Sequence, residues 1–402
     1  MTTAPALPCP VCGGDDIRVV FRTAAPVPVF CNWLYASAEA ALDAAAAEIR
    51  LVVCAGCGHL YNEAHDEALV TYGAGYENSL HFSPSFSRYA DGLAARLVSQ
   101  HGLGGGTVLE IGSGKGDFLT LLVEHGAGQA VGYDPSYDGE QDADIGDARI
   151  TFVRGLFPER PGGLDVDLVC ARHVLEHVQH PAAMLSTLRD ALRASRPAVL
   201  YVEVPDGGYL LGETALWDLI YEHPSHFTAS SLHRLSTDAG LPVTSLSTSF
   251  GDQYLCLEAT SDVDRRGVSA PSVGPVLDLA AGFADRASYA IHYWQDELAQ
   301  AAAAGRRVAL WGTGSKGVTF LNVVPGALAV EHVVDVNPRK HGKHVPGTGH
   351  QVVGPPALPS NPPDLVIVMN PLYVDEVRSA MSRLGIRAEV MSAVTSPAAA
   401  SA

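Results

Sequence analysis

The chain has 402 residues, and at roughly 150 residues per domain this length predicts two or three domains. Its residues are 47% hydrophobic and 17% charged, which excludes a largely disordered protein because such chains are poor in apolar residues and rich in charge. The 26 Lys and Arg residues against 44 Asp and Glu give a net charge of -18, and no basic run offsets it. We therefore exclude nucleic acid and an anionic membrane as partners.

Two further absences bear on location. No stretch of the chain approaches the roughly 18 consecutive apolar residues of a membrane span. The first basic residue is Arg18, so the N-terminus does not resemble a signal peptide. We expect a cytoplasmic protein with a small-molecule substrate, and the sequence leaves monomer and dimer open.

Four of the 7 cysteines fall into two close pairs. Cys9 and Cys12 stand in CPVC, and Cys54 and Cys57 stand in CAGC. Paired CxxC spacing without a secretory signal indicates metal binding rather than disulfides. Four thiolates suit Zn²⁺ in a closed tetrahedral site, which has no open position for catalysis. The sequence therefore predicts a structural zinc module over residues 1–62, and four reduced core thiols are the alternative.

A helix followed by alternating strands and helices marks the next part of the chain. Ser83 and Pro84 predict the start of a helix that ends near Gln100, with Ser83 as the N-cap. Short apolar, β-branched runs then predict strands near residues 107, 130, 150, 166 and 198. This alternation predicts a doubly wound parallel sheet. Two last strands, 243–250 and 254–260, are so close in sequence that they must be antiparallel.

The polar segment 261–275, which contains Pro, Gly and Ser, predicts a domain boundary. We place the middle domain at 63–262 and a C-terminal domain at 263–402. The latter begins with an Ala-rich helix that ends near Ala304 and then alternates strand and helix again. It is predicted to be a second, Rossmann-like α/β domain.

A glycine-rich loop follows the first strand of the middle domain. It contains, in order, Glu110, Gly112, Gly114, Gly116 and Phe118. The glycines allow a ligand close to the backbone, and the helix after them begins with free N–H groups that suit a carboxylate. The GxGxG spacing and the acid before it suit a cationic ligand better than a pyrophosphate. At the end of the next strand, Asp134 is placed to bind ribose hydroxyls.

These motifs resemble a known family. VLEIGSGKGDF, GYDPS and ARHVLEHV resemble motifs I, II and IV of class I S-adenosylmethionine (SAM)-dependent methyltransferases. The chain has a cysteine module, then an α/β core and then a tail with GTGSKG. This order of parts, over nearly the whole chain, resembles that of the three-domain C-methyltransferases that act on deoxysugar nucleotides. The resemblance implies structural zinc in front, SAM in the middle domain, and a tail domain that helps to enclose the substrate. It implies that SAM is lined by Glu110, Gly112, Gly114, Gly116, Phe118 and Asp134.

Methylation of a carbon next to a ketone requires removal of a proton and stabilisation of an enolate, for which a positioned histidine is suited. The sequence offers two histidine clusters. One is RHVLEHV, with His173 and His177, after the fourth predicted strand. We interpret His173 and Arg172 there as local hydrogen-bonding residues. The other is IYEHPSHF, with Tyr221, Glu222, His223 and His226.

The second cluster resembles the family's catalytic segment IYHEHLSYF. This implies that His223 is the general base, that Glu222 is its acidic helper, and that His177 faces the substrate. Tyr76 resembles the family's front-lid tyrosine, and we add Tyr221 as a catalytic candidate and His226 as a substrate-binding one. The chain departs from the family by one residue that is missing or shifted before Glu222, by His226 in place of tyrosine, and by GDQYL in place of a GGSLR-like stretch.

A second glycine loop, GTGSKG at 312–317, precedes Asp335 at the end of the next predicted strand. As a bare pattern it is a dinucleotide motif and would support an NAD-dependent oxidoreductase. Lys316 and the basic stretch after Asp335 instead favour a phosphate or another anion of the substrate, held by Gly314 and Lys316. A merely structural turn is the third interpretation.

The sequence therefore predicts an α/β protein in which a class I methyltransferase sheet lies between a zinc module and a Rossmann-like domain. The predicted activity is SAM-dependent C-methylation of a small polar metabolite, such as a keto-deoxysugar nucleotide. The alternatives are an O-, N- or S-methyltransferase of another natural-product intermediate, a SAM-binding protein without catalysis, and the oxidoreductase.

Overall fold

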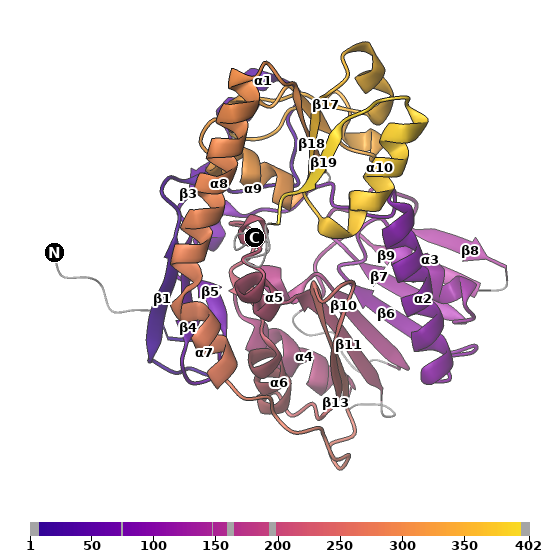
Figure 1. Cartoon of the computed structure of the whole chain (residues 1–402). Helices are drawn as coiled ribbons and strands as arrows, with labels where there is room; N and C mark the ends of the chain where they lie inside the picture. Colours follow the sequence, from indigo (N-terminus) through magenta and orange to yellow (C-terminus); the bar gives the residue numbers. More distant parts are fainter. Residues whose placement is uncertain (1–7, 74, 147, 159–164, 193–197, 395–402) are drawn as a thin grey trace.

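The computed structural model describes residues 8–73, 75–146, 148–158, 165–192 and 198–394 (Figure 1). The described residues form a mixed α/β protein with a four-stranded, an eight-stranded and a five-stranded sheet, together with a two-stranded pair. This confirms the predicted α/β class. None of the described helices combines the length and the apolar character needed to cross a membrane.

The N-terminal sheet is antiparallel and takes its last strand from far along the chain. Its order is β1 (Ile17–Arg22), β4 (Arg50–Cys54), β5 (Leu60–Asn62) and β12 (Ser225–His226). Ser225 pairs with Tyr61 and His226 with Leu60, so the histidine segment is attached to the cysteine module. The segment between β1 and β4 carries β2 (Val27–Pro28), α1 (Ala38–Leu42) and β3 (Ala46–Ala47). Its helix α1 contacts the C-terminal part of the chain, where the Gly347 N–H donates to the Ala41 carbonyl oxygen (Figure 1). The 3-10 turn η1 (Glu67–Leu69) follows β5.

The central sheet has the strand order β13, β14, β11, β10, β6, β7, β9, β8. The pairs from β11 to β9 are parallel, and β13, β14 and β8 are antiparallel to their neighbours. All five predicted parallel strands and the terminal antiparallel pair are confirmed. The bounds are β6 (Thr107–Ile111), β7 (Gln129–Tyr133), β8 (Asp142–Ile145), β9 (Ala148–Val153), β10 (Leu168–Arg172), β11 (Val199–Pro205), β13 (Val243–Ser249) and β14 (Tyr254–Thr260).

Helices cover both faces of this sheet. Leu168 and Cys170 of β10 share a core with α2 (Pro84–Gln100) and α3 (Asp117–Glu124). Val169, which points to the opposite face, shares a core with α4 (Pro181–Leu192) and α6 (Ala229–Asp238). The predicted N-cap of α2 is confirmed, because the Ser83 hydroxyl accepts a hydrogen bond from the Phe86 N–H.

The C-terminal sheet is parallel and has the order β17, β16, β15, β18, β19. Its strands are β15 (Val308–Trp311), β16 (His332–Val334), β17 (Val352–Val353), β18 (Leu365–Val368) and β19 (Glu389–Ser392). The helices are α7 (Gly274–Ala281), α8 (Phe283–Ala303), α9 (Ser315–Val323) and α10 (Val374–Arg383). Short turns are η4 (Ala327–Ala329), η5 (Pro338–Lys340), η6 (Pro355–Ser360) and η7 (Pro371–Tyr373).

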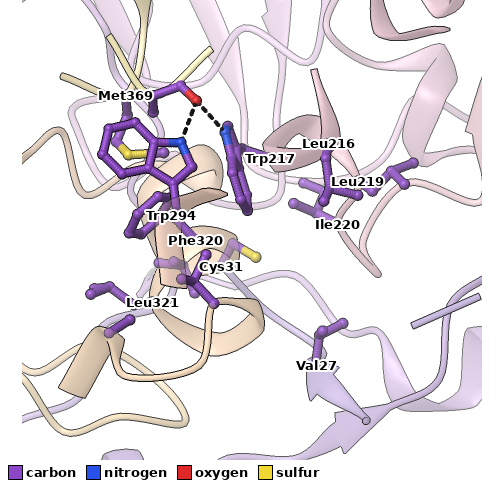
Figure 2. Close-up of a cluster of buried hydrophobic side chains, with 14 of the residues drawn as sticks. Val27, Cys31, Leu216, Trp217, Leu219, Ile220, Trp294, Phe320, Leu321 and Met369 are labelled. Carbon is purple, nitrogen blue, oxygen red and sulfur yellow. Dashed lines mark hydrogen bonds between the residues drawn. The ribbon is translucent and has the colours of Figure 1, made fainter. Parts of the chain in front are cut away.

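One hydrophobic core joins the three parts of the chain (Figure 2). Trp217, in η3 (Leu216–Asp218), and Trp294, in α8, both donate indole N–H hydrogen bonds to the Ala393 carbonyl, at 2.9 and 3.0 Å. Both rings pack against Phe320 of α9. This core fixes the segment between α5 (Gly207–Gly212) and β12, which carries the second histidine cluster.

Candidate active site

A cavity of about 300 Å³ lies at the carboxyl ends of the central strands, and residues of the C-terminal α/β part line its other side. Both glycine loops and both histidine clusters contribute to its wall. Of the predicted site residues, those that line it are Tyr76, Glu110, Gly112, Gly114, Phe118, His177, His223, Gly314 and Lys316. In the described part of the chain, its lining does not include Gly116, Asp134, Tyr221, Glu222 or His226.

The first glycine loop connects β6 with α3. Gly112 has φ +71°, and a Cβ atom there would lie 2.3 Å from Cγ2 of Val174, so the turn requires glycine. Glu110 is 3% exposed, and its Oε2 has no hydrogen-bond partner among the described residues. Burial raises the pKa of Glu110 to about 8, although Arg172 opposes this shift. The loop therefore presents a buried carboxyl group that can take a cationic partner.

Asp134 lies directly after β7 and holds the glycine loop. Its Oδ2 accepts a hydrogen bond from the Gly114 N–H at 2.8 Å, and its Oδ1 accepts from the backbone and hydroxyl of Ser136 at 2.7 and 2.6 Å. Gly116 is the N-cap residue of α3. These two predicted cofactor residues thus shape the loop that lines the cavity, and the ribose contact of Asp134 stays a prediction.

A buried ion pair lies beneath this loop. Arg172, the last residue of β10, donates from Nε and Nη2 to Oε1 of Glu203 at 3.0 and 2.8 Å. Its guanidinium also lies 4.0 Å from the centre of the Phe118 ring. Burial would raise the pKa of Glu203, but Arg172 and His173 hold it below its ordinary value. Arg172 therefore anchors a ring that lines the cavity.

His173 follows β10 in a left-handed conformation with φ +54°, which is unusual for a residue other than glycine. Its ring lies between two carboxylates, 3.4 Å from Glu176 and 3.3 Å from Glu203. Burial would lower the pKa of His173, but hydrogen bonds to these two carboxylates outweigh it and raise the pKa to about 9. The local hydrogen-bonding role predicted for Arg172 and His173 agrees with these contacts.

The two histidine clusters meet at the cavity. The His177 and His223 rings are nearly perpendicular, with centroids 4.5 Å apart. Burial lowers the pKa of both, so both are neutral at neutral pH. His177 Nδ1 lies 3.1 Å from the Glu222 carbonyl oxygen and 2.7 Å from the Tyr72 hydroxyl. Because a carbonyl oxygen can only accept, Nδ1 carries the proton and Nε2 keeps the lone pair.

The Glu222 side chain is a neighbour of Tyr76 and of the backbone of Cys31 and Asn32. Glu222 is fully buried, and burial raises its pKa to about 8, although backbone N–H groups of Cys31 and Asn32 and the Tyr76 hydroxyl oppose the shift. Tyr76 lines the cavity, and its hydroxyl accepts a hydrogen bond from Asn32 Nδ2 at 3.3 Å. The Glu222 side chain therefore lies next to the cavity wall.

The side chains of Tyr221 and His226 do not line the cavity described above. The Tyr221 hydroxyl accepts a hydrogen bond from the Asp66 N–H at 2.8 Å, and its ring stacks on His65. His226 is held in β12, its ring centroid lies 5.8 Å from that of His223, and burial lowers its pKa to about 4. Both residues therefore support the segment that carries His223.

The second glycine loop connects β15 with α9 on the opposite wall. A Cβ atom at Gly317 would lie 2.0 Å from the Gly312 carbonyl oxygen, so the loop requires glycine there. Lys316 forms an ion pair with Asp218 of η3. Asp335 accepts hydrogen bonds from the N–H and hydroxyl of Thr313 and pairs with Lys340 at 3.3 Å. The charge of Asp335 is thus neutralised by Lys340. A carboxylate that binds the ribose of a dinucleotide would instead be free to accept hydrogen bonds from the ribose hydroxyls.

The four predicted zinc ligands lie together at one end of the N-terminal sheet. All four sulfur atoms are within 4.8 Å of one another, with Cys9 to Cys57 at 3.6 Å and Cys12 to Cys54 at 3.5 Å. Four sulfurs at about 2.3 Å from one tetrahedral Zn²⁺ would be about 3.8 Å apart. The free thiols therefore have a spacing that fits zinc.

Sequence reasoning missed several residues of this site. Tyr72, Glu176 and Glu203 contact the histidines, although no motif singled them out. Glu176 stands inside RHVLEHV and could have been identified from that motif. Tyr72 and Glu203 had no such signal, because their contacts come from distant parts of the chain.

Two family models match the chain. A methyltransferase domain matches residues 85–246, from α2 to β13, and a C-methyltransferase C-terminal domain matches residues 276–389, from α7 to β19. No match to the chain was found among curated proteins.

Several solved structures are similar to less than half of the chain. One comes from the complex of the Haloferax volcanii Trm112 methyltransferase activator with a methyltransferase; it is 17% identical, with 46% of this chain and 99% of that chain covered and a TM-score of 0.35. Another is the Burkholderia thailandensis 1,6-didemethyltoxoflavin-N1-methyltransferase, at 15% identity, 44% and 80% coverage and a TM-score of 0.34. A third is the Synechocystis magnesium protoporphyrin IX methyltransferase, at 20% identity, 44% and 79% coverage and a TM-score of 0.32.

Proposed function

We propose that this chain, which is a SAM-dependent methyltransferase with a C-methyltransferase C-terminal domain, methylates a carbon next to the carbonyl group of a small polar metabolite. A keto-deoxysugar nucleotide is the first candidate. The observation that carries the proposal is that one cavity joins the first glycine loop, the neutral pair His177 and His223, and the loop of the C-methyltransferase C-terminal domain.

SAM would be held by the first glycine loop. The unpartnered Oε2 of Glu110 suits the ammonium group of SAM, and Gly112 and Gly114 let SAM approach the backbone. Asp134 would use its remaining lone pairs for ribose hydroxyls, while Gly116 sets the start of α3 and Phe118 supplies an apolar wall. When bound, SAM supplies a methyl group already activated by its sulfonium.

His223 would act as the general base. Its neutral imidazole takes the proton from the carbon next to the carbonyl, and that carbon keeps the electron pair as an enolate. The new carbon–carbon bond then forms as the bond between sulfur and the methyl group breaks, and S-adenosylhomocysteine leaves. Glu222 is kept as the proposed acidic helper because it directly precedes His223 in the chain. The Nε2 lone pair of His177 would accept a hydrogen bond from a substrate hydroxyl.

The second glycine loop would bind the polar end of the substrate. Gly314 and Lys316 line the cavity opposite the first loop. A phosphate could replace Asp218 as the partner of Lys316, because it is a stronger anionic acceptor. His226 would support this side of the pocket through His223. The neutralised Asp335 argues against NAD in the same loop.

The four cysteines would hold one structural Zn²⁺. Their spacing supports this proposal, and a site closed by four thiolates has no position for a substrate. The metal would link Cys9 and Cys12 to Cys54, the last residue of β4, and to Cys57 just after it.

The test uses SAM with a ¹³C-labelled methyl group and a panel of keto-sugar nucleotides. We expect a product in which the labelled methyl is bonded to carbon, as shown by carbon–carbon coupling in NMR spectra. Without SAM, the enzyme in D₂O should exchange the proton next to the carbonyl, and His223→Asn should abolish this exchange. Methyl transfer to oxygen, nitrogen or sulfur, or unchanged exchange in His223→Asn, would contradict the proposal.

A further inference from the structure

We propose that Glu176, His177 and His223 form a second metal site, separate from the four cysteines, which binds one divalent transition-metal ion. One carboxylate oxygen of Glu176 and one nitrogen from each histidine lie within 4.8 Å of one another. Glu176 and His177 come from η2 (Leu175–His177), whereas His223 comes from the loop before β12, so only the fold brings the three together.

Among the described residues, two of the donor atoms have no hydrogen-bond partner. Glu176 is 2% exposed, and its Oε2 has no hydrogen bond among the described residues. The Nδ1 atom of His223 is buried and also has no partner there. Buried polar atoms are normally hydrogen-bonded, so unpartnered atoms on side chains whose ligand atoms lie within 4.8 Å of one another point to a ligand at this place.

The polar atoms of Glu176 and His177 that would not bind the metal contact other protein groups, as is usual for metal ligands. The Nδ1–H of His177 donates to the Glu222 carbonyl oxygen, which leaves the Nε2 lone pair free to bind a metal. The other oxygen of Glu176 lies 3.4 Å from Nδ1 of His173, which in turn contacts Glu203. Such outer contacts fix the tautomer and the orientation of metal ligands.

The donor set defines the class of ion. Two imidazoles and one carboxylate suit Zn²⁺, Co²⁺, Ni²⁺ or Fe²⁺, whereas Mg²⁺ and Ca²⁺ prefer oxygen ligands only. Ligands bound at about 2.1 Å are roughly 3 to 3.5 Å apart, so small side-chain rotations close the present spacing. Because all three residues line the cavity, the ion would keep open positions on that side.

Metal binding has a consequence that rests on the proposed function. An ion coordinated by His223 would occupy the lone pair that takes the proton from the substrate. We therefore expect transition-metal ions to inhibit proton removal, and the metal-free protein to be the active form at this site. The four cysteines would keep their own metal in both states.

The test adds Co²⁺ to untagged protein that is loaded with zinc at the four cysteines. Wild-type protein should bind one further equivalent, with visible d–d absorption but no thiolate-to-cobalt charge transfer. The affinity should fall by about tenfold or more in Glu176→Gln and in His177→Asn. The control is His180→Asn, an exposed neighbour that should leave binding unchanged.

A second measurement does not depend on variants. In NMR spectra of the wild-type cobalt protein, we expect strongly shifted, exchangeable N–H signals from two coordinated imidazoles. The proposal is overturned if wild-type protein shows no further cobalt binding or no shifted signals. It is also overturned if Glu176→Gln and His177→Asn, folded by circular dichroism, bind cobalt like wild type. Loss of proton exchange in metal-free wild type would instead contradict the proposed function.

Discussion

The replacement Glu203→Gln tests whether the ion pair beneath the glycine loop is as important as its burial suggests. Glu203 is fully buried and accepts two hydrogen bonds from Arg172, one from Tyr201 at 2.9 Å and one from Tyr89. The glutamine keeps the shape but removes the negative charge, which leaves the buried Arg172 without its counter-ion. Loss of one partner from a buried pair costs about 3–5 kcal/mol.

The measurement is urea unfolding of wild type and variant, followed by circular dichroism at neutral pH. Glu48→Gln is the matched control, because Glu48 pairs with Arg22 at the surface, where the two side chains are 47% and 56% exposed. An ion pair between two such exposed side chains contributes about 0.2–1 kcal/mol. If Glu203→Gln is no more destabilising than Glu48→Gln, the reasoning from burial is wrong.

The same variant has a defined pH dependence. The pKa of Glu203 is held below its ordinary value in the folded protein, so its stabilising effect is present above the unfolded pKa of about 4.5 and is lost as the pH falls through the folded pKa. The difference in unfolding free energy between wild type and Glu203→Gln should therefore be constant near neutral pH and shrink in acid. A difference that grows in acid would refute this assignment.

Four further predictions concern the ligands. SAM binding near pH 7 should release a proton from Glu110, whose pKa burial raises to about 8, and calorimetry in buffers of different ionisation enthalpy should show that Glu110→Gln abolishes the release. Asp134→Ala should weaken SAM binding by roughly 1.5–3 kcal/mol in the same instrument without loss of helix content. His223→Asn should lower turnover by about 10²–10⁴-fold with SAM affinity nearly unchanged. Freshly purified protein should contain one Zn²⁺ by elemental analysis, and chelation should first increase hydrogen exchange in residues 8–62.

Each of these predictions has a contradicting outcome. Equal proton release in Glu110→Gln would place the titrating group elsewhere, and unchanged affinity in Asp134→Ala would remove that residue from the ribose. Wild-type turnover in His223→Asn would require another base. Reduced protein without zinc would leave the four cysteines as core thiols.

Sequence alone determined the elements whose signals are local. The apolar runs of β6, β10 and β11 were recognisable because these strands are buried on both faces. In β7 and β9 buried residues alternate with less buried ones, and their β-branched and aromatic residues gave the signal. Ser83 with Pro84 marked the start of α2. The strand β8 was missed because it lies at the sheet edge and none of its residues is buried. The glycine loop was recognisable since its backbone conformation at Gly112 requires glycine.

Only the tertiary structure decided how these parts form one site. β12 pairs with β5, although most of the sequence of the middle domain lies between these two strands. Trp217 and Trp294 both donate hydrogen bonds to the carbonyl oxygen of Ala393. These contacts bring His223 to His177 and pair Lys316 with Asp218. Such contacts depend on packing between segments that are far apart in sequence, where no local pattern encodes the partner. The motifs therefore pointed to the two glycine loops and the two histidine clusters that line the cavity, whereas Tyr72 and Glu203, which contact the histidines, became visible only in the structure.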